Sequence, residues 1–197
     1  MQFPVTIWFH SLGWTAKLSL TDWAGATVGY SPLIFGEDRC LPVYADQDMA
    51  RQTYAVRWLG PARNDVALLD AEGTPIGGVA LPKPQGWGSD GTYVVSVGGE
   101  ERFDIVERSP GLHLVDGFID TVPVANVLTG LMLQPCHVFR RRAGGEQVAI
   151  MVKHRTMFDA SYRLELTGAV DDRDGECIML AGTMVAIGVR RLVASWP

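Results

Sequence analysis

Four basic residues near the end of the chain have a spacing that suits the binding of an anion. They flank Gly144 and Gly145, a pair typical of a two-residue hairpin turn. Pairing outward from this turn places alternate residues of both strands on one face, so the sequence predicts an outward row of positive charge. The members of this basic row are Arg140, Arg142, Lys153 and Arg155.

The basic row has two interpretations. Guanidinium and ammonium groups can hold an anionic lipid headgroup or an acidic protein partner through charge-assisted hydrogen bonds. The same charges can instead form a solvated strand face that discourages edge pairing. The basic row follows from a predicted pairing of the two strands on either side of the turn. This pairing sets Arg142 opposite Gln147, Arg140 opposite Ala149, Cys136 opposite Lys153 and Phe139 opposite Ile150.

Patterns for catalysis and zinc binding are absent from the sequence. It contains no G-x-S-x-G motif for a serine nucleophile, and the glycine-rich GWGSDG lacks the lysine of a phosphate loop. There is no C-x-x-C or H-E-x-x-H pair, and the adjacent Cys136 and His137 should point to opposite faces of a strand. We therefore expect no catalytic residue, no metal site and no cofactor. An enzyme built on His137 or His154 stays open as an alternative.

The acidic segment AVDDRDGE resembles a calcium loop only superficially. With Gly175 as its sixth position, Val170 and Ala181 would occupy ligand positions, and neither side chain can bind calcium. The segment is predicted to be a turn that leads into a helix, with Asp174 as the N-cap residue.

Composition and charge narrow the class of protein. With 197 residues, 47% hydrophobic and 20% charged, residues 1–197 are predicted to form a single globular domain. A net charge of -5 predicts no nucleic-acid partner, because phosphate binding depends on lysine and arginine. Three widely spaced cysteines and an N-terminus without the basic start of a secretory signal predict a cytoplasmic protein. The lipid interpretation would add peripheral attachment to a membrane.

Short β-rich runs broken by glycine, proline and aspartate extend from Val5 to about Val170 and predict an all-β body. The loop from Leu81 to Gly91 carries Trp87, which stacks on a ligand, sits at a membrane surface or folds back over the end of the barrel. Residues Thr121 to Leu133 fit a short helix or a strand. The predicted strands are Phe3 to Phe9, Ala16 to Leu20, Thr27 to Leu33, Leu41 to Ala45, Thr53 to Leu59, Asp65 to Leu69, Pro75 to Leu81, Thr92 to Val97, Glu101 to Glu107, Gly111 to Val115, Cys136 to Arg141, Gln147 to Lys153 and Ser161 to Thr167.

Two predicted hairpins share one spacing of residues. LSLTDWAGATVGY and VALLDAEGTPIGGV each contain aspartate, then glycine three residues later, then an aliphatic residue followed by a second glycine. Aspartate can bond the backbone of its own turn, and glycine supplies the positive φ that the tip requires. The match favours a repeated structural unit over two unrelated hairpins.

The segment from Glu176 to Trp196 differs from the rest of the chain. It has no charged residue from Cys177 to Val189, so a helix here is apolar on every face and must be surrounded. The uncharged run is shorter than the roughly 18 apolar residues of a membrane span, and Arg190 and Arg191 end it. We predict a helix enclosed by the β-rich body and no transmembrane span.

The chain resembles the tubby C-terminal-like superfamily in three features. These are an apolar helix near the C-terminus, the repeated D-x-x-G hairpins and the block VAIMVKHRTMFDASYRLELTG. The nearest relatives within it are the LURP-one-related and phospholipid scramblase-like proteins. The resemblance implies a closed antiparallel barrel of about twelve strands around a central helix. The chain shows neither the proline-rich tail nor the cysteine cluster of scramblases, so the resemblance carries over the fold rather than scrambling activity.

These observations lead to one functional expectation with two alternatives. We expect a non-enzymatic, soluble β-barrel that acts as a binding or scaffold module for an unidentified partner. The first alternative is a peripheral binder of anionic phospholipid or phosphoinositide headgroups that uses the basic row. The second is an enzyme with an unrecognised active site.

Overall fold

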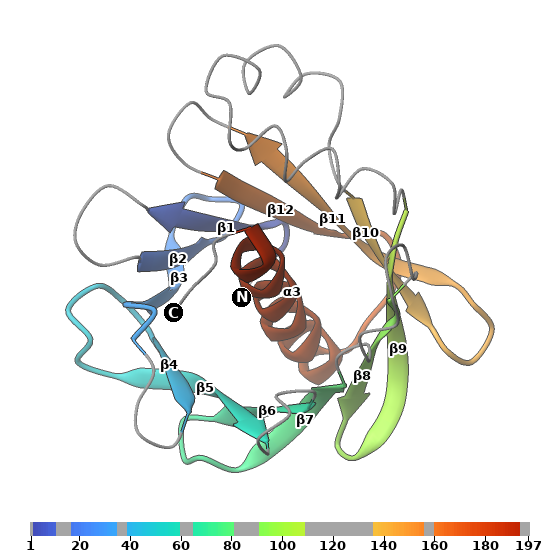
Figure 1. Ribbon diagram of the computed structural model, residues 1–197, viewed down its shortest axis with the longest axis horizontal. Helices are drawn as coiled ribbons and strands as arrows, with labels where there is room; N and C mark the ends of the chain where they lie inside the picture. The colour runs from blue at the N-terminus through green and yellow to red at the C-terminus, as the bar shows by residue number, and fades with distance from the viewer. Residues whose placement is uncertain are drawn as a thin grey trace.

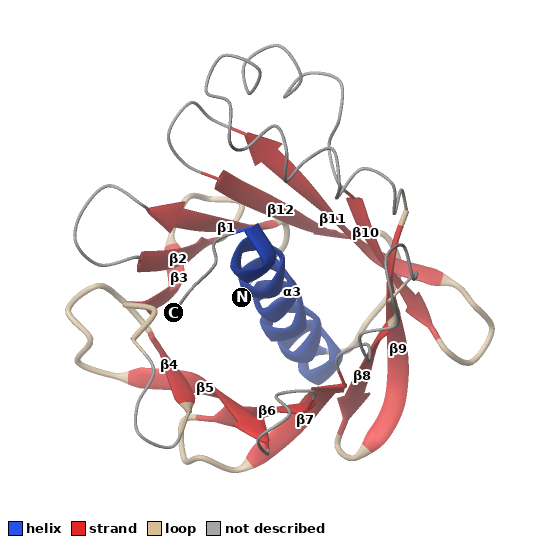
Figure 2. Ribbon diagram, viewed as in Figure 1, coloured by secondary structure: helices blue, strands red, loops and turns tan. Residues whose placement is uncertain are grey.

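The computed structural model describes residues 2–10, 17–34, 39–59, 65–80, 91–108, 136–155 and 160–193. Within these residues, twelve antiparallel strands form a closed barrel around one helix, α3 (Figures 1 and 2). Neighbours in the barrel are neighbours in the sequence, and β1 closes the ring by pairing with β12. The predicted fold class, a mainly β barrel of about twelve strands around a C-terminal hydrophobic helix, is confirmed.

The strand bounds agree with the predicted runs to within two residues wherever the structure describes them. The predicted strand at Gly111 to Val115, the loop around Trp87 and the segment from Thr121 to Leu133 lie outside the described residues. The strands are β1 (Val5–His10), β2 (Lys17–Thr21), β3 (Thr27–Ser31), β4 (Cys40–Tyr44), β5 (Gln52–Leu59), β6 (Asp65–Asp70), β7 (Pro75–Ala80), β8 (Tyr93–Val97), β9 (Glu100–Glu107), β10 (Cys136–Arg141), β11 (Gln147–Arg155) and β12 (Ala160–Leu166).

The β2–β3 and β6–β7 hairpins have the same turn. In each, the glycine N–H donates to the carbonyl of the aspartate three residues earlier, at 2.9 Å for Gly25 and Asp22 and 3.1 Å for Gly73 and Asp70. Both glycines have a φ of 80°, a conformation that favours glycine over other residues. Both aspartate side chains accept a backbone N–H from four residues later in the turn.

The two hairpins also share their register. Leu20 faces Gly29 in the first and Leu68 faces Gly77 in the second, and a bulge follows each leucine. The second glycine of the sequence pattern therefore lies opposite a buried leucine in both places. The predicted repeat is confirmed as a structural unit.

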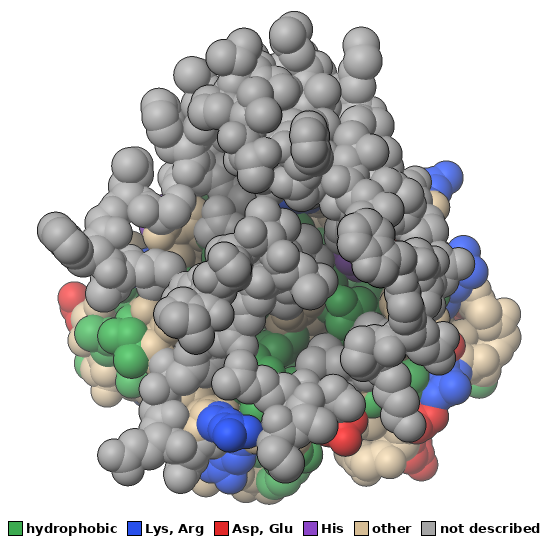
Figure 3. Space-filling model, in the orientation of Figure 1, with side chains coloured by type: hydrophobic (Ala, Val, Ile, Leu, Met, Phe, Trp, Pro, Cys, Tyr) green, Lys and Arg blue, Asp and Glu red, His purple; other side chains and the backbone are tan. Residues whose placement is uncertain are grey.

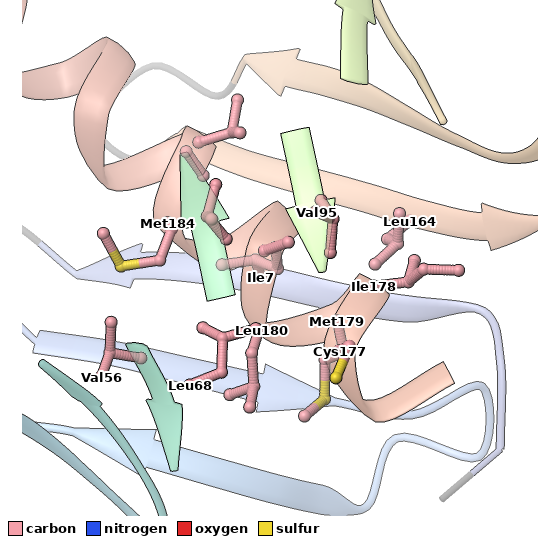
Figure 4. Packing of buried hydrophobic residues seen from close by; sticks show 14 of the residues in the cluster. Ile7, Val56, Leu68, Val95, Leu164, Cys177, Ile178, Met179, Leu180 and Met184 are labelled. Atoms are coloured by element: carbon pink, nitrogen blue, oxygen red, sulfur yellow. The ribbon is translucent and has the colours of Figure 1, made fainter. Parts of the chain in front are cut away.

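Helix α3 (Asp172–Val193) runs through the middle of the barrel (Figure 1). Every residue from Cys177 to Ile187 is buried, which confirms the predicted enclosure for this part of the helix. Figure 4 shows Leu180 and Met184 of α3 among residues such as Ile7 of β1 and Val56 of β5, which come from separate parts of the ring. Within the described residues, no helix has the length and apolar character needed to cross a membrane.

The N-cap residue of α3 is Asp171, and the prediction of Asp174 is wrong. Asp171 Oδ1 accepts the backbone N–H of Asp174 at 2.7 Å, as an N-cap side chain does. The helix begins earlier than predicted, at Asp172, so Asp174 lies inside its first turn. There Asp174 is buried, and its Oδ1 accepts a hydrogen bond of 2.8 Å from Nη1 of Arg102 on β9.

The two ends of the barrel can be distinguished by the direction of the strands. Successive strands are antiparallel and β12 leads directly into α3, so the turns after β2, β4, β6, β8 and β10 lie at the end where α3 begins. Tyr54, near the start of β5, accordingly donates a hydrogen bond of 3.0 Å to Glu176 Oε1 near the start of α3. We name this the hairpin end. The opposite end, where β9 and β11 finish and β10 and β12 begin, is the loop end.

Candidate binding site inside the loop end of the barrel

The described members of the basic row do not lie on one face. Arg140 is exposed, whereas Lys153 is only 4% exposed and belongs to the interior. Arg142 forms ion pairs with Glu101 and with Asp104, whose Oδ1 lies 3.3 Å from its Nε. The side chain of Arg155 lies outside the described residues. The prediction of an outward row that includes Lys153 is therefore wrong.

The surface view agrees with these ion pairs. On the face shown in Figure 3, basic and acidic side chains of the described residues lie next to one another at the right-hand rim. Positive charge is thus interspersed with negative charge at this rim rather than gathered in a separate patch.

The predicted register between β10 and β11 is wrong by one residue. Phe139 pairs with Ala149 rather than with Ile150, because residues 142–145 form a wider turn and a bulge follows Phe139. A slip of one residue exchanges the two faces of a strand. Lys153 consequently points inward, on the same face as Ala149.

The corrected register brings four polar side chains together on the inner wall of the barrel. His137 on β10 faces Glu107 on β9, and Lys153 on β11 faces Tyr162 on β12. His137 is also diagonal to Lys153, since its direct partner on β11 is Met151. We name Glu107, His137, Lys153 and Tyr162 the interior polar cluster.

Three members of the interior polar cluster, His137, Lys153 and Tyr162, are buried, and Glu107 is partly buried. His137 and Tyr162 are each 1% exposed, and Glu107 Oε1 is inaccessible to solvent. Each of the four residues has an interaction partner within the molecule. Charged and hydrogen-bonding groups of this kind lose hydration when buried, so their placement needs compensating contacts.

The surroundings of the interior polar cluster are mostly apolar. The Tyr162 ring packs edge-on against Phe9 of β1, with 5.9 Å between ring centroids. Ile7 and Leu164, which follow toward the hairpin end, are both fully buried. Tyr93 on β8 pairs with Ile105 of β9, and burial and the nearby Glu107 charge raise the pKa of its hydroxyl. The arrangement is a small set of polar groups above an apolar floor.

The four residues also share a position along their strands. Glu107 ends β9, His137 is the second residue of β10, and Lys153 and Tyr162 are each two residues from a strand end. All four therefore lie close to the loop end of the barrel.

Polar groups at the hairpin end have a structural role instead. Arg102 on β9 lies 2.8 Å from Asp174 and 3.7 Å from Asp171, which fixes the start of α3 against the barrel wall. Cys177 donates its S–H to the carbonyl of Ile76 on β7 at 3.7 Å. These contacts hold the helix in register with the strands.

Two further findings limit the chemistry of the described residues. His10 Nε2 lies 2.9 Å from the buried hydroxyl of Ser19 on the outer face, a pair that the sequence analysis did not detect. Within the described residues, the hydrogen bond of His10 is to Ser19 and none joins it to a carboxylate, so the pair lacks the third member of a catalytic triad. No group of three or more metal-ligating side chains occurs in the described part of the chain.

The histidines of the enzyme alternative lie in different places. His137 belongs to the interior polar cluster. His154, the residue after Lys153, is exposed. Glu107 and Tyr162 were not predicted from the sequence. Both occupy inward positions in strands with alternating burial, EERFDIVE in β9 and ASYRLEL in β12, and a polar residue at such a position was the available signal.

The comparisons with known proteins leave the function to be argued from the site, since no family model, curated protein or solved structure matches this chain.

Proposed function

We propose that the protein is a non-enzymatic binding module that takes a small polar ligand at the interior polar cluster. The observation that supports this proposal is the burial of His137, Lys153 and Tyr162 on one stretch of the inner wall. Ligand sites in proteins typically combine an apolar lining with a few convergent polar groups. The interior polar cluster has this composition.

The energetics of burial support the same proposal. Replacing buried ionic groups with apolar residues of similar volume is often neutral or stabilising, so such groups are not needed to hold a core together. Most other buried side chains in the described part of the barrel interior are hydrophobic, the exceptions being Ser31 on β3 and Asp174 and Thr183 on α3. A role in recognition accounts for polar residues at one end of that interior.

The proposal can be tested by thermal shift with a panel of small carboxylates, phosphates, amines and carbonyl compounds. We expect at least one class to raise the melting temperature of the wild-type protein and of Arg140→Gln, an exposed outer-face control. Tyr162→Phe and Lys153→Met should lose that shift while remaining folded by circular dichroism. A shift that is equal in all four proteins would contradict binding at the interior polar cluster.

The exposed side chain of Arg140 favours a second candidate, peripheral binding of anionic lipid headgroups. Flotation with liposomes that contain or lack phosphoinositide should show binding by the wild type and a loss in Arg140→Glu. Equal and negligible flotation of both proteins would reject this candidate.

Membership of the tubby C-terminal-like superfamily is also a proposal. It is supported by the closed barrel of twelve strands around a hydrophobic helix, which is the arrangement that the sequence resemblance implies. An experimental structure compared with members of that superfamily would test it, and a different strand order would contradict it.

A further inference from the structure

We propose that the barrel opens and recloses at the seam between β3 and β4, so that this seam is a gate between solvent and the inner wall. The inference goes beyond the proposed function, because it concerns the wall of the barrel and holds whether or not a ligand binds at the interior polar cluster. Three features of the two strands support it: their backbone pairing, the prolines beside that pairing and the side chains that close the seam.

The first feature is the pairing of the backbones. Within the described residues, β3 and β4 share a single pair, Tyr30 with Tyr44, at the left of the ring in Figure 1. Every other pair of neighbouring strands shares at least four. Parts of a protein with few hydrogen bonds and contacts open at a lower free energy than the whole molecule unfolds. The ring is therefore weakest at this seam.

The second feature explains why the pairing stops. The Trp58 N–H donates to the carbonyl of Arg39 at 3.2 Å, so Arg39 and alternate residues after it turn their backbone groups toward β5. Pro42 lies between such residues and turns its backbone nitrogen toward β3, but proline has no N–H to donate. Extending the single β3–β4 pair by two residues would set Pro32 opposite Pro42. Neither residue can donate a hydrogen bond across the seam.

The backbone beyond the prolines also limits the pairing. Leu33 follows β3 and Arg39 precedes β4, and both have a φ of 53°. A positive φ lies outside the extended region that strands occupy, and residues other than glycine adopt it at an energetic cost. Neither strand can therefore continue past these residues to add pairs.

The third feature is the packing that keeps the seam closed. A Cβ atom added at Gly29 of β3 would lie 2.7 Å from Leu20 Cδ1 and 3.2 Å from Val43 Cγ1. The Val43 side chain of β4 thus reaches the β3 backbone on the inner side, where Leu20 and Val43 are fully buried. Apolar contacts are non-directional and need no exact alignment to re-form. An opening here breaks one backbone pair and leaves the pairing of the other strands intact.

The experiment places a cysteine at one of four inward positions, with one protein for each. Ser31→Cys on β3, where Ser31 faces the buried Leu18, and Val43→Cys on β4 flank the β3–β4 seam. Val79→Cys and Val95→Cys face each other across the β7–β8 seam and are the controls. All four residues are at most 1% exposed in the closed barrel. The folded proteins are treated with iodoacetamide, and peptide mass spectrometry distinguishes each probe from the native cysteines.

We expect the two β3–β4 probes to be alkylated at least about tenfold faster than the two β7–β8 probes in the native protein. In protein unfolded by urea, all four probes should react at equal rates. Urea denaturation of each variant corrects the native rates for differences in global stability. If Val43→Cys does not fold, Ser31→Cys still reports on the seam, because it only exchanges a hydroxyl for a thiol.

Pro42→Val tests the cause of the weak pairing. It returns a backbone N–H to the side of β4 that faces β3, so it should slow the alkylation of the Ser31→Cys probe. The same substitution should leave the Val95→Cys probe unchanged. Equal corrected rates at all four probes in the native protein would overturn the gate, and an unchanged Ser31→Cys rate in the Pro42→Val background would overturn the role of the proline.

Discussion

Gly77 on β7 lies against the start of α3, at a point where the barrel wall has no space for a side chain. A Cβ atom there would lie 2.4 Å from the carbonyl oxygen of Ser96 and 2.9 Å from the Sγ of Cys177. The first contact is with backbone, which cannot move aside as the end of a flexible side chain can. This residue therefore sets how closely β7, β8 and α3 approach.

We expect Gly77→Ala to lower the free energy of unfolding by about 1–3 kcal/mol, because overpacking displaces the strand or the helix. Urea denaturation followed by circular dichroism measures the change. Gly175→Ala is the control: its Cβ would be at an ordinary 3.5 Å from Phe3, and alanine in a helix is favoured over glycine by up to about 1 kcal/mol. Equal stability of Gly77→Ala and the wild type would show that the wall is looser than the structure indicates.

The start of α3 is fixed by two kinds of contact, one within the helix and one with the barrel wall. Asp171 provides the local cap, and Asp174 provides a buried ion pair to Arg102 on the barrel wall. The cap belongs to the helix alone, whereas the ion pair joins the helix to β9. The two aspartates should therefore differ in what their loss does.

Asp171→Ala should lower the free energy of unfolding by about 1 kcal/mol, the usual effect of losing an N-cap side chain. Asp174→Ala should lower it further, because the partly exposed Arg102 loses its nearest carboxylate and the buried position loses its hydrogen bond. Thermal unfolding of both variants gives the order. A larger effect of Asp171→Ala would mean that the helix start is held mainly by its own turn.

The buried middle of α3 should not tolerate charge. Ala186 is fully buried, so Ala186→Arg would place an unpaired guanidinium in the core and destabilise the fold by more than about 4 kcal/mol. Gly182→Leu should also prevent folding, because even a Cβ atom added at Gly182 would lie 3.3 Å from the Leu164 side chain. Soluble yield and melting temperature measure both effects.

Ala169→Arg, at an exposed position before the helix, is the matched control for Ala186→Arg and should behave as the wild type. Normal melting of Ala186→Arg would show that α3 is not enclosed in solution.

The sequence allowed the elements to be predicted better than their register. The Asp22 and Asp70 hairpins were predictable because each turn is held by bonds among residues a few positions apart. The β10–β11 pairing was not, because every residue from Val148 to Val152 is apolar and fits either face. Pairing outward from a two-residue turn placed Lys153 on the solvent face, and the bulge after Phe139 reversed that assignment. The candidate site was missed for the same reason.

At the scale of the whole molecule, the barrel and the helix depend on groups that remain protonated in the folded state. Burial raises the pKa of the Cys177 thiol from 9.0 to about 12, and burial together with the Glu176 charge raises the pKa of the Tyr54 hydroxyl from 10.0 to about 12. Both groups lie between α3 and the surrounding strands. Their ionisation is therefore linked to the stability of the closed structure.

The free energy of unfolding should fall as the pH rises from 9 toward 12. In this range the unfolded chain releases protons that the folded protein retains, so increasing pH favours unfolding. Below pH 9 the contribution of both groups is fully present. Urea denaturation at a series of alkaline pH values measures the slope, and the double variant Cys177→Ser, Tyr54→Phe should have a shallower one. An unchanged slope in that variant would assign the effect to other groups.

The position of α3 after the twelve described strands has a consequence for biosynthesis. A ribosome releases every strand before the helix that fills the barrel, at about 5–20 residues per second. Until α3 emerges, inward residues such as Ile7, Leu68 and Phe103 have no helix to cover them, and β1 waits for its partner β12. The nascent chain therefore passes through a state with exposed apolar surface, and such states are prone to aggregation.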